Sequence, residues 1–283
     1  MKLVLVVLCV MVCLSVASSS DGMLDYVTSN PEYIETDDIS VSFIQEWVLS
    51  TTGNALGIDV FDTGGLTYVI YSDATNDELG QLDVSTGTSG YFATLDPANG
   101  SCFGNAWDGD ITSPLWLTSD WTDSENYNSY DLTTWFTTSD PSGAFGRGVA
   151  HNDGYFWTAD YYGGCYAFVP GGASSNFSTP EVPTGISGIA AFDYSGTTLV
   201  VLTCYQTHSL WCYSFDGSTL TFQGSCALPG TIYRSYGLGF SDLRGTLFWL
   251  YAPVSGDYRI AELIFTFTSL QRSTWGELKT LFD

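Results

Sequence analysis

The most regular feature of the chain is a meander of short strands that alternate apolar and polar residues around tight turns. The stretch FGRGVAHNDGYFWTADYYGGCYAFVPG, residues 145–171, shows it clearly. A first strand ends at Asp153, an Asp-Gly turn leads to a second strand, YFWTAD, and a Gly-Gly turn leads to a third, CYAFV. This periodicity with such turns predicts antiparallel strands that pair with their sequence neighbours.

The same unit recurs five times along the chain. Its first strands are GIDVFD (57–62), FGNAWD (103–108), GVAHND (148–153), GIAAFD (188–193) and GLGFSD (237–242). Each ends on an aspartate, and these closing aspartates follow one another at intervals of 46, 45, 40 and 49 residues. Because a four-stranded blade has this length, the repeat predicts an all-β protein, a β-propeller of five antiparallel blades.

The two ends of the repeat array complement each other. The fifth unit lacks a fourth strand, whereas the strand at Gln45–Ser50 has no first three strands before it. We therefore expect the N-terminal strand to complete the last blade, which removes free sheet edges. Six blades are the alternative if residues 265–283 contribute more strands.

The chain divides into four predicted segments. Residues 1–18 have the charged start, apolar core and small-residue end of a signal peptide, and this apolar run is too short for a membrane span. An acidic linker or arm is expected at residues 19–38, the propeller at 39–272, and a short helix at 273–283, where T-x-x-E forms a capping box. The sequence thus predicts an exported protein, extracellular or periplasmic, with no membrane span.

One turn of these repeats is similar to a turn found in known repeat proteins. LDVSTG, residues 82–87, is similar to the LDxxTG turn of quinoprotein-like repeats. Over roughly residues 40–270, the blades resemble secreted prokaryotic β-propellers of the YVTN, NHL and quinoprotein-like type. The tryptophan that usually follows the quinoprotein turn is missing, which argues against the cofactor-bearing branch. The resemblance implies the fold and no particular activity.

The net charge of the chain restricts the classes of molecule that it is expected to bind. A net charge of −24 with only seven lysines and arginines argues against a partner with a phosphate backbone, so no nucleic acid is expected to bind. The acidity fits a soluble extracellular protein and favours cations or neutral molecules as ligands, although charge for solubility alone is the alternative.

Five cysteines lie beyond the signal segment, so they cannot all pair with one another. Cys204 and Cys212 flank the turn of a predicted hairpin, where symmetric placement would bring them within disulfide reach. The alternative is that both are small buried apolar side chains. The chain has no CxxC motif and no cluster of histidine and cysteine, which argues against structural zinc.

The loops between second and third strands are the candidate ligand site, because a meander sends all of them to one rim. Acids stand beside aromatic residues there, a combination suited to sugars, and clustered oxygen ligands also suit calcium. The candidate residues of this loop rim are Asp73, Asp120, Trp121, Asp160, Tyr161, Tyr162 and Tyr205. Solvated loops whose aromatic residues pack between blades are the alternative.

The central channel offers a second candidate. Three and five residues before the closing aspartates most positions are glycine or alanine, as expected where strands crowd an axis. Asp59 and Asn105 are exceptions that could hold a metal cation or water, or simply form a solvated lining. The closing aspartates recur in every unit, which favours a structural role as turn caps. His151 stands two residues before its closing aspartate, at a position that is apolar in the first strands of the other units, which favours a place in the core.

These observations predict an exported, non-catalytic binding module that meets a glycan or a protein ligand, carbohydrate being the favoured class. GxSxG, HExxH and P-loop motifs are absent from the sequence. One alternative is a glycoside-active enzyme that pairs Asp59 with an acid of the Asp73–Glu78 loop. The other is an extracellular structural component that assembles with itself.

Overall fold

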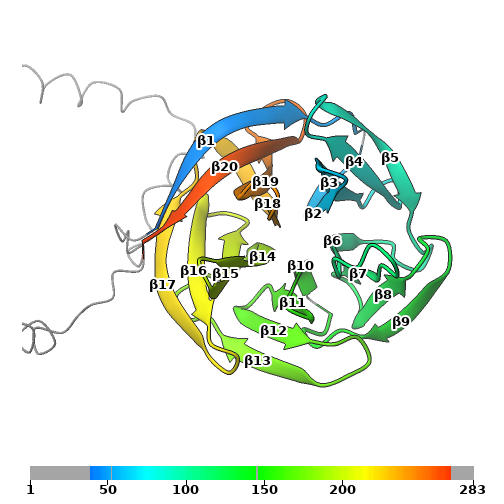
Figure 1. Cartoon of the computed structure of the whole chain (residues 1–283). Coiled ribbons are helices and arrows are strands. Elements are labelled where there is room, and N and C mark those ends of the chain that lie inside the picture. The colour runs from blue at the N-terminus through cyan, green and yellow to red at the C-terminus, as the bar shows by residue number, and fades with distance from the viewer. Residues whose placement is uncertain (1–38, 52, 145, 269–283) are drawn as a thin grey trace, which may run out of the picture. The chain divides into compact units, whose positions relative to one another are not determined.

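The computed structural model describes residues 39–51, 53–144 and 146–268, which form twenty strands in five four-stranded antiparallel sheets (Figure 1). The predicted signal peptide, acidic arm and C-terminal helix lie outside the described residues. Within that part of the chain, no helix has the length and apolar character needed to cross a membrane. The five sheets stand around a common axis, so the predicted five-bladed propeller is confirmed.

Four blades are simple meanders in which each strand pairs with its sequence neighbours. Blade 1 contains β2 (Ala55–Thr63), β3 (Leu66–Asp73), β4 (Glu78–Asp83) and β5 (Thr88–Thr94). Blade 2 contains β6 (Cys102–Trp107), β7 (Trp116–Asp120), β8 (Glu125–Ser129) and β9 (Trp135–Ser139). Blade 3 contains β10 (Gly146–Asn152), β11 (Tyr155–Asp160), β12 (Gly164–Phe168) and β13 (Ser174–Ser178). Blade 4 contains β14 (Ile186–Tyr194), β15 (Thr197–Cys204), β16 (Ser209–Phe215) and β17 (Leu220–Ala227).

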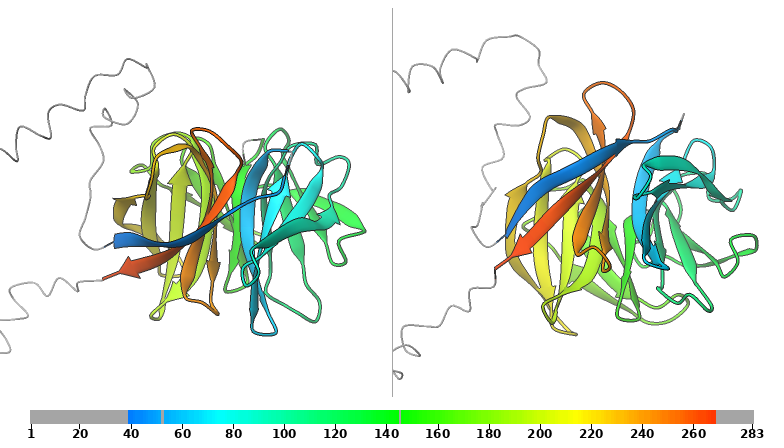
Figure 2. Two further views of the ribbon diagram at one scale, coloured as in Figure 1. Left: turned by 90° about the horizontal axis from the view of Figure 1, so that it is seen from above. Right: turned by 45° about the horizontal axis from the view of Figure 1, so that its top comes forward.

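Blade 5 joins the two ends of the described chain. It contains β18 (Ile232–Ser241), β19 (Thr246–Pro253), β20 (Arg259–Phe267) and, as its outer strand, β1 (Ile39–Val48). β1 runs antiparallel to β20 along its whole length, and Figures 1 and 2 show the two side by side. Ion pairs of Arg244 with Glu262 and of Arg259 with Glu46 stabilise this sheet. The predicted closure of the ring by the N-terminal strand is confirmed.

Apolar and aromatic side chains fill the spaces between blades. The second strands are buried on both faces, and in β15 the run Leu199–Leu202 is fully buried. Aromatic rings meet across the blade boundaries: Phe192 stacks on Phe240 at 3.8 Å, and Phe61 meets Trp107 edge-on at 4.5 Å. Such pairs stabilise the contact between neighbouring blades beyond the free energy of area burial alone.

Around the axis, the first strands touch at glycines that we call the axial glycines: Gly57, Gly104, Gly148, Gly188 and Gly237. A Cβ atom added to Gly188 would lie 2.2 Å from the carbonyl oxygen of Tyr236, and one added to Gly57 would lie 2.3 Å from that of Phe103. Real Cβ atoms do not approach backbone this closely, so only glycine permits the contact. The small residues expected at the axis are therefore required by direct backbone contact between blades.

The predicted disulfide is wrong, because Cys204 and Cys212 are both free thiols in this structure. Cys212 lies opposite Val201 in the β15–β16 ladder, whereas Cys204 ends β15 three residues further along. That offset corresponds to roughly 10 Å, beyond the Cα separation that a disulfide spans. The hairpin is not symmetric about its turn, and both thiols are buried as the alternative interpretation held.

A substitution at an axial glycine tests the constraint on the ring. We expect Gly188→Ala to lower the free energy of unfolding by about 3 kcal/mol, because the backbone of blade 5 must move to admit the methyl group. Gly90→Ala is the matched control, since a Cβ there meets no atom within 4 Å. Urea unfolding followed by tryptophan fluorescence measures both, and equal stability of the two variants would contradict the expectation.

Candidate functional site

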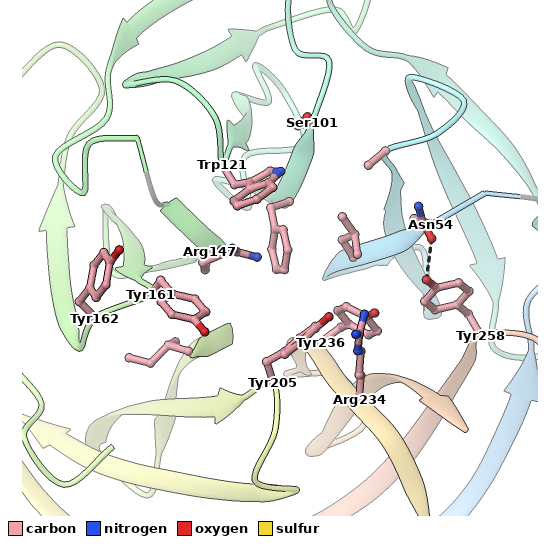
Figure 3. A pocket seen from close by; sticks show the side chains of 14 residues that line it. Asn54, Ser101, Trp121, Arg147, Tyr161, Tyr162, Tyr205, Arg234, Tyr236 and Tyr258 are labelled. Atoms are coloured by element: carbon pink, nitrogen blue, oxygen red, sulfur yellow. Dashed lines mark hydrogen bonds between the residues drawn. The ribbon is translucent and has the colours of Figure 1, made fainter. Parts of the chain in front are cut away.

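A cavity of about 650 Å³ opens at the loop rim, at one mouth of the central channel (Figure 3). We call it the aromatic pocket, because seven of its fourteen lining residues are aromatic. The lining consists of Asn54, Leu56, Ala74, Ser101, Phe103, Trp121, Arg147, Tyr161, Tyr162, Ile186, Tyr205, Arg234, Tyr236 and Tyr258. All five blades contribute, so the site exists only in the closed ring.

Two structural sources supply these side chains. One is the set of loops between second and third strands, which carries Trp121, Tyr205 and Tyr258 among others. The other is the start of each first strand, where the pairing register is interrupted by a bulge. A bulge bends its strand and re-aims the side chain beside it. The bulges between Gly146 and Val149 and between Ile232 and Arg234 flank the two arginines of the pocket.

The aromatic rings of the pocket support one another. Tyr236 lies at the centre of this packing, with ring centroids 5.7 Å from both Tyr205 and Tyr258 and 6.5 Å from Phe103. The Tyr258 hydroxyl also donates a hydrogen bond to Asn54 Oδ1 at 2.9 Å. Side chains fixed in this way lose little conformational freedom when a ligand binds, so the pocket is largely preorganised.

The two arginines lie against aromatic faces. The Arg147 guanidinium carbon is 4.3 Å from the Trp121 ring centroid and 4.4 Å from that of Phe103. Arg234 is 4.5 Å from the ring centroids of both Tyr205 and Tyr233. In Figure 3, Arg147 and Arg234 approach the pocket from different sides of the ring. These cation–π contacts hold the guanidinium groups at the pocket wall.

The structure brings together the aromatic half of the predicted loop rim. Trp121, Tyr161, Tyr162 and Tyr205 all line the aromatic pocket. Tyr162 is 64% exposed and Trp121 is 37% exposed, so both rings are accessible at the mouth. The alternative was that the aromatic residues of the rim pack between blades. The exposure of Tyr162 and Trp121 does not agree with it.

The acidic half of the prediction is placed differently. Asp73, Asp120 and Asp160 end their second strands, and none of them lines the pocket. The Asp120 carboxylate accepts hydrogen bonds from the N–H groups of Ser101 and Thr122 at 3.0 and 2.6 Å. Asp160 accepts from Tyr162 N–H at 2.7 Å and Tyr166 O–H at 2.9 Å, and Asp73 accepts from Thr75 N–H at 3.1 Å. These carboxylates shape the loops that present the aromatic rings.

The closing aspartates gather at the opposite mouth, which we call the acidic mouth. A smaller cavity of about 360 Å³ there is lined by Asp59 and by four of the closing aspartates, Asp62, Asp108, Asp153 and Asp242. Asp62 accepts from Thr67 Oγ1 at 2.7 Å, Asp108 from Leu115 N–H at 3.0 Å, and Asp193 from Thr198 Oγ1 at 2.8 Å. Asp108 also accepts from Asp110 N–H at 3.1 Å, so it caps its own loop as expected. Asp62 and Asp193 instead bind the threonine hydroxyl of their ladder partner across the hairpin.

The channel candidates Asp59 and Asn105 both contact the backbone of a neighbouring blade. Asp59 accepts a hydrogen bond from Trp107 N–H at 2.9 Å, and the buried Asn105 amide donates to the carbonyl oxygen of Ile70 at 3.3 Å. Across the described residues, no group of three or more His, Cys, Asp or Glu side chains is arranged to hold a metal ion. A metal at Asp59 and Asn105 therefore stays a prediction.

His151 has both apolar and polar surroundings. Its ring lies 4.9 Å from that of Phe156, and it also lines the acidic mouth. Burial lowers the pKa of the imidazole, so the neutral form is favoured. Packing against Phe156 agrees with the interpretation of this histidine as a structural residue.

The acid pair required by the enzyme alternative is not assembled. Asp59 pairs with Ile70 in the β2–β3 ladder, whereas Asp73 lies opposite Ala55 at the other end of the hairpin. The separation along the strands is roughly 10–13 Å, more than the carboxylate spacing that glycoside hydrolysis uses. Asp59 lines the acidic mouth and the Asp73–Glu78 loop belongs to the loop rim.

Comparison of the sequence with models of protein families and with curated proteins finds no match in either case. Solved structures do match. Glutaminyl cyclase of Myxococcus xanthus is 15% identical, with a TM-score of 0.55 over 81% of this chain and 97% of that chain. The PQQ-bound aldose sugar dehydrogenase of Streptomyces coelicolor is 14% identical, with a TM-score of 0.51 over 82% of this chain and all of that chain. These similarities confirm the predicted resemblance to β-propeller proteins at the level of the fold alone.

The Asp59 carboxyl provides a test by pH. Burial raises the pKa of this group from 3.8 to about 7, so the folded protein keeps a proton that the unfolded chain loses above about pH 4. The free energy of unfolding therefore falls as pH rises from about 4 to 7, by an amount on the order of 3 kcal/mol.

Asp59→Asn removes this titration and keeps an oxygen acceptor for Trp107 N–H. We expect the variant to gain stability relative to the wild type as pH rises, measured by urea unfolding at pH 4.5 and pH 8. Other titrating groups affect both proteins equally and cancel in the difference. A difference in stability that does not change between the two pH values would contradict the shifted pKa.

Proposed function

We propose that the protein is a non-catalytic binding module that takes a carbohydrate in the aromatic pocket. The observation that supports this most directly is the set of accessible aromatic faces around one concave, preorganised cavity. Aromatic faces bind the C–H surfaces of sugar rings, and a cavity of this size falls within the range of small-ligand sites. The signal peptide predicted from the sequence would place the encounter outside the cytoplasm.

The polar groups of the pocket suit sugar hydroxyls. Burial raises the pKa of Tyr205 and of Tyr236 to about 12, so both phenols stay neutral and can donate or accept hydrogen bonds. The side chains of Asn54, Ser101 and the two arginines add further donors. Few polar groups placed among aromatic faces are what fixes the orientation of a ligand in a largely apolar site.

The composition of the lining favours binding over catalysis. None of the fourteen lining residues is a carboxylic acid, a histidine or a cysteine. These are the side chains that most often serve as general acid, general base or nucleophile at neutral pH. A binding role therefore accounts for the pocket more simply than a hydrolytic one.

Glycan-array binding with a rim variant tests the proposal. We expect the wild type to bind a defined set of glycans and Tyr162→Ala to lose about tenfold in affinity, because one stacking face is removed. Tyr162 is 64% exposed, so its loss should leave the fold intact. Tyr91→Ala is the control, since Tyr91 is similarly exposed at 60% but lies on the outer strand β5. A blank array, or equal losses in both variants, would refute a sugar site in the pocket.

The same array tests the calcium expectation. Calcium requires six to eight oxygen ligands, usually including carboxylates, and the pocket lining contains no carboxylate. We therefore expect binding to be the same in Ca²⁺ and in EDTA. Loss of binding in EDTA would mean that a cation takes part in recognition, as the sequence alone allowed.

A further inference from the structure

Cationic side chains are rare in this protein, and their distribution is uneven. The part of the chain that the structure describes contains four of the seven, all arginines: Arg147, Arg234, Arg244 and Arg259. Arg244 and Arg259 form ion pairs with glutamates of blade 5. Arg147 and Arg234 line the aromatic pocket instead, and neither has a carboxylate within ion-pair distance among the described residues.

Arg147 is held without a counter-ion. Aromatic rings surround its guanidinium, and its Nε is buried without a hydrogen-bond partner among the described residues. Desolvation lowers the pKa of this group, although a guanidinium stays protonated at neutral pH. Removing a cation from water without pairing it costs free energy, which the quadrupoles of the rings offset only in part. The bare protein therefore contains an incompletely compensated positive charge.

The surrounding protein keeps acids away from this charge. The chain has 31 aspartates and glutamates, yet none of those within the described ranges lines the aromatic pocket. Asp73, Asp120 and Asp160 are close in sequence to lining residues, but their carboxylates bind turn N–H or hydroxyl groups. The pocket is thus a locally positive site in a protein with a net charge of −24.

We infer that the ligand of the aromatic pocket carries an anionic oxygen group, a carboxylate or a sulfate on a sugar, and that Arg147 binds this group. The inference rests on the proposed function, since the sugar body would occupy the aromatic faces. A guanidinium presents planar, parallel donors that match such a group with two hydrogen bonds. Arg234 adds a second positive charge to the same pocket.

The net charge of the chain does not oppose this inference. Charges separated by more than about 8 Å are largely screened at physiological ionic strength, so the nearest groups decide the potential inside a pocket. The groups nearest to a pocket ligand are two arginines and neutral rings. The expectation of a cationic or neutral ligand rests on the net charge of the whole chain, whereas the inference rests on the groups that line this pocket.

The experiment is an array in which each acidic glycan stands beside a neutral counterpart. Uronic-acid and sialylated glycans are paired with their methyl esters, and sulfated glycans with the unsulfated parent. We expect an acidic spot to bind at least tenfold better than its neutral partner, and the two kinds of acid show whether carboxylate or sulfate is the source. Equal binding within every pair would overturn the inference and leave the proposed function standing. A blank array would remove both.

Two variants assign the effect to Arg147. We expect Arg147→Gln to lose at least tenfold more affinity for the acidic glycan than for its neutral counterpart. Arg147→Lys keeps the charge but not the planar donors, and should retain part of the preference. Urea unfolding checks that both variants fold, and Arg147→Gln should be no less stable because an unpaired cation is removed. Loss of affinity for both glycans alike, or for neither, would contradict the role of Arg147.

Discussion

The close contact of the first strands at the axial glycines is the constraint on which the rest of the structure depends. Because Gly57, Gly188 and Gly237 touch the backbone of the next blade, the five inner strands form a narrow ring. The cavities at its two ends share no lining residue. The protein therefore has two separate mouths, and each acquires its chemistry from a different set of strand ends and loops.

Turn formation explains why those two mouths differ. A meander needs a tight turn at every strand end, and aspartate caps such turns by accepting backbone N–H groups. The acids that end the second strands serve this purpose, as the hydrogen bonds of Asp120 and Asp160 to backbone N–H groups of their own loops show. At the acidic mouth the closing aspartates line the cavity itself. At the loop rim the caps face the loops themselves, which leaves aromatic rings and arginines to line the pocket.

The sequence predicts the five-bladed ring and its closure because the signals that set them are local and repeated. Closing aspartates at near-constant intervals reveal the blades, and the missing fourth strand reveals the closure by β1 (Ile39–Val48).

The pocket is predicted only in its aromatic part. Arg147 and Arg234 were missed because strand bulges, which an alignment on the closing aspartates does not reveal, turn them into the pocket. The scarcity of basic residues was the signal that could have found them. The predicted pairing of Cys204 with Cys212 is wrong because the two residues are not opposite each other. The backbone hydrogen bonds between β15 and β16 place Val201 opposite Cys212.

The two pairs of arginines show how the same side chain serves opposite purposes in one protein. Arg244 and Arg259 lie beside glutamates, so their charges are neutralised and stabilise the blade that closes the ring. Arg147 is positioned by aromatic faces, which fix a guanidinium in place without cancelling its charge. A carboxylate in the same position would have fixed it equally well and left nothing for a ligand to neutralise. Because aromatic rings and not carboxylates surround Arg147, its positive charge stays available inside a strongly acidic protein. An available positive charge is the physical condition for selecting an anionic ligand at this site.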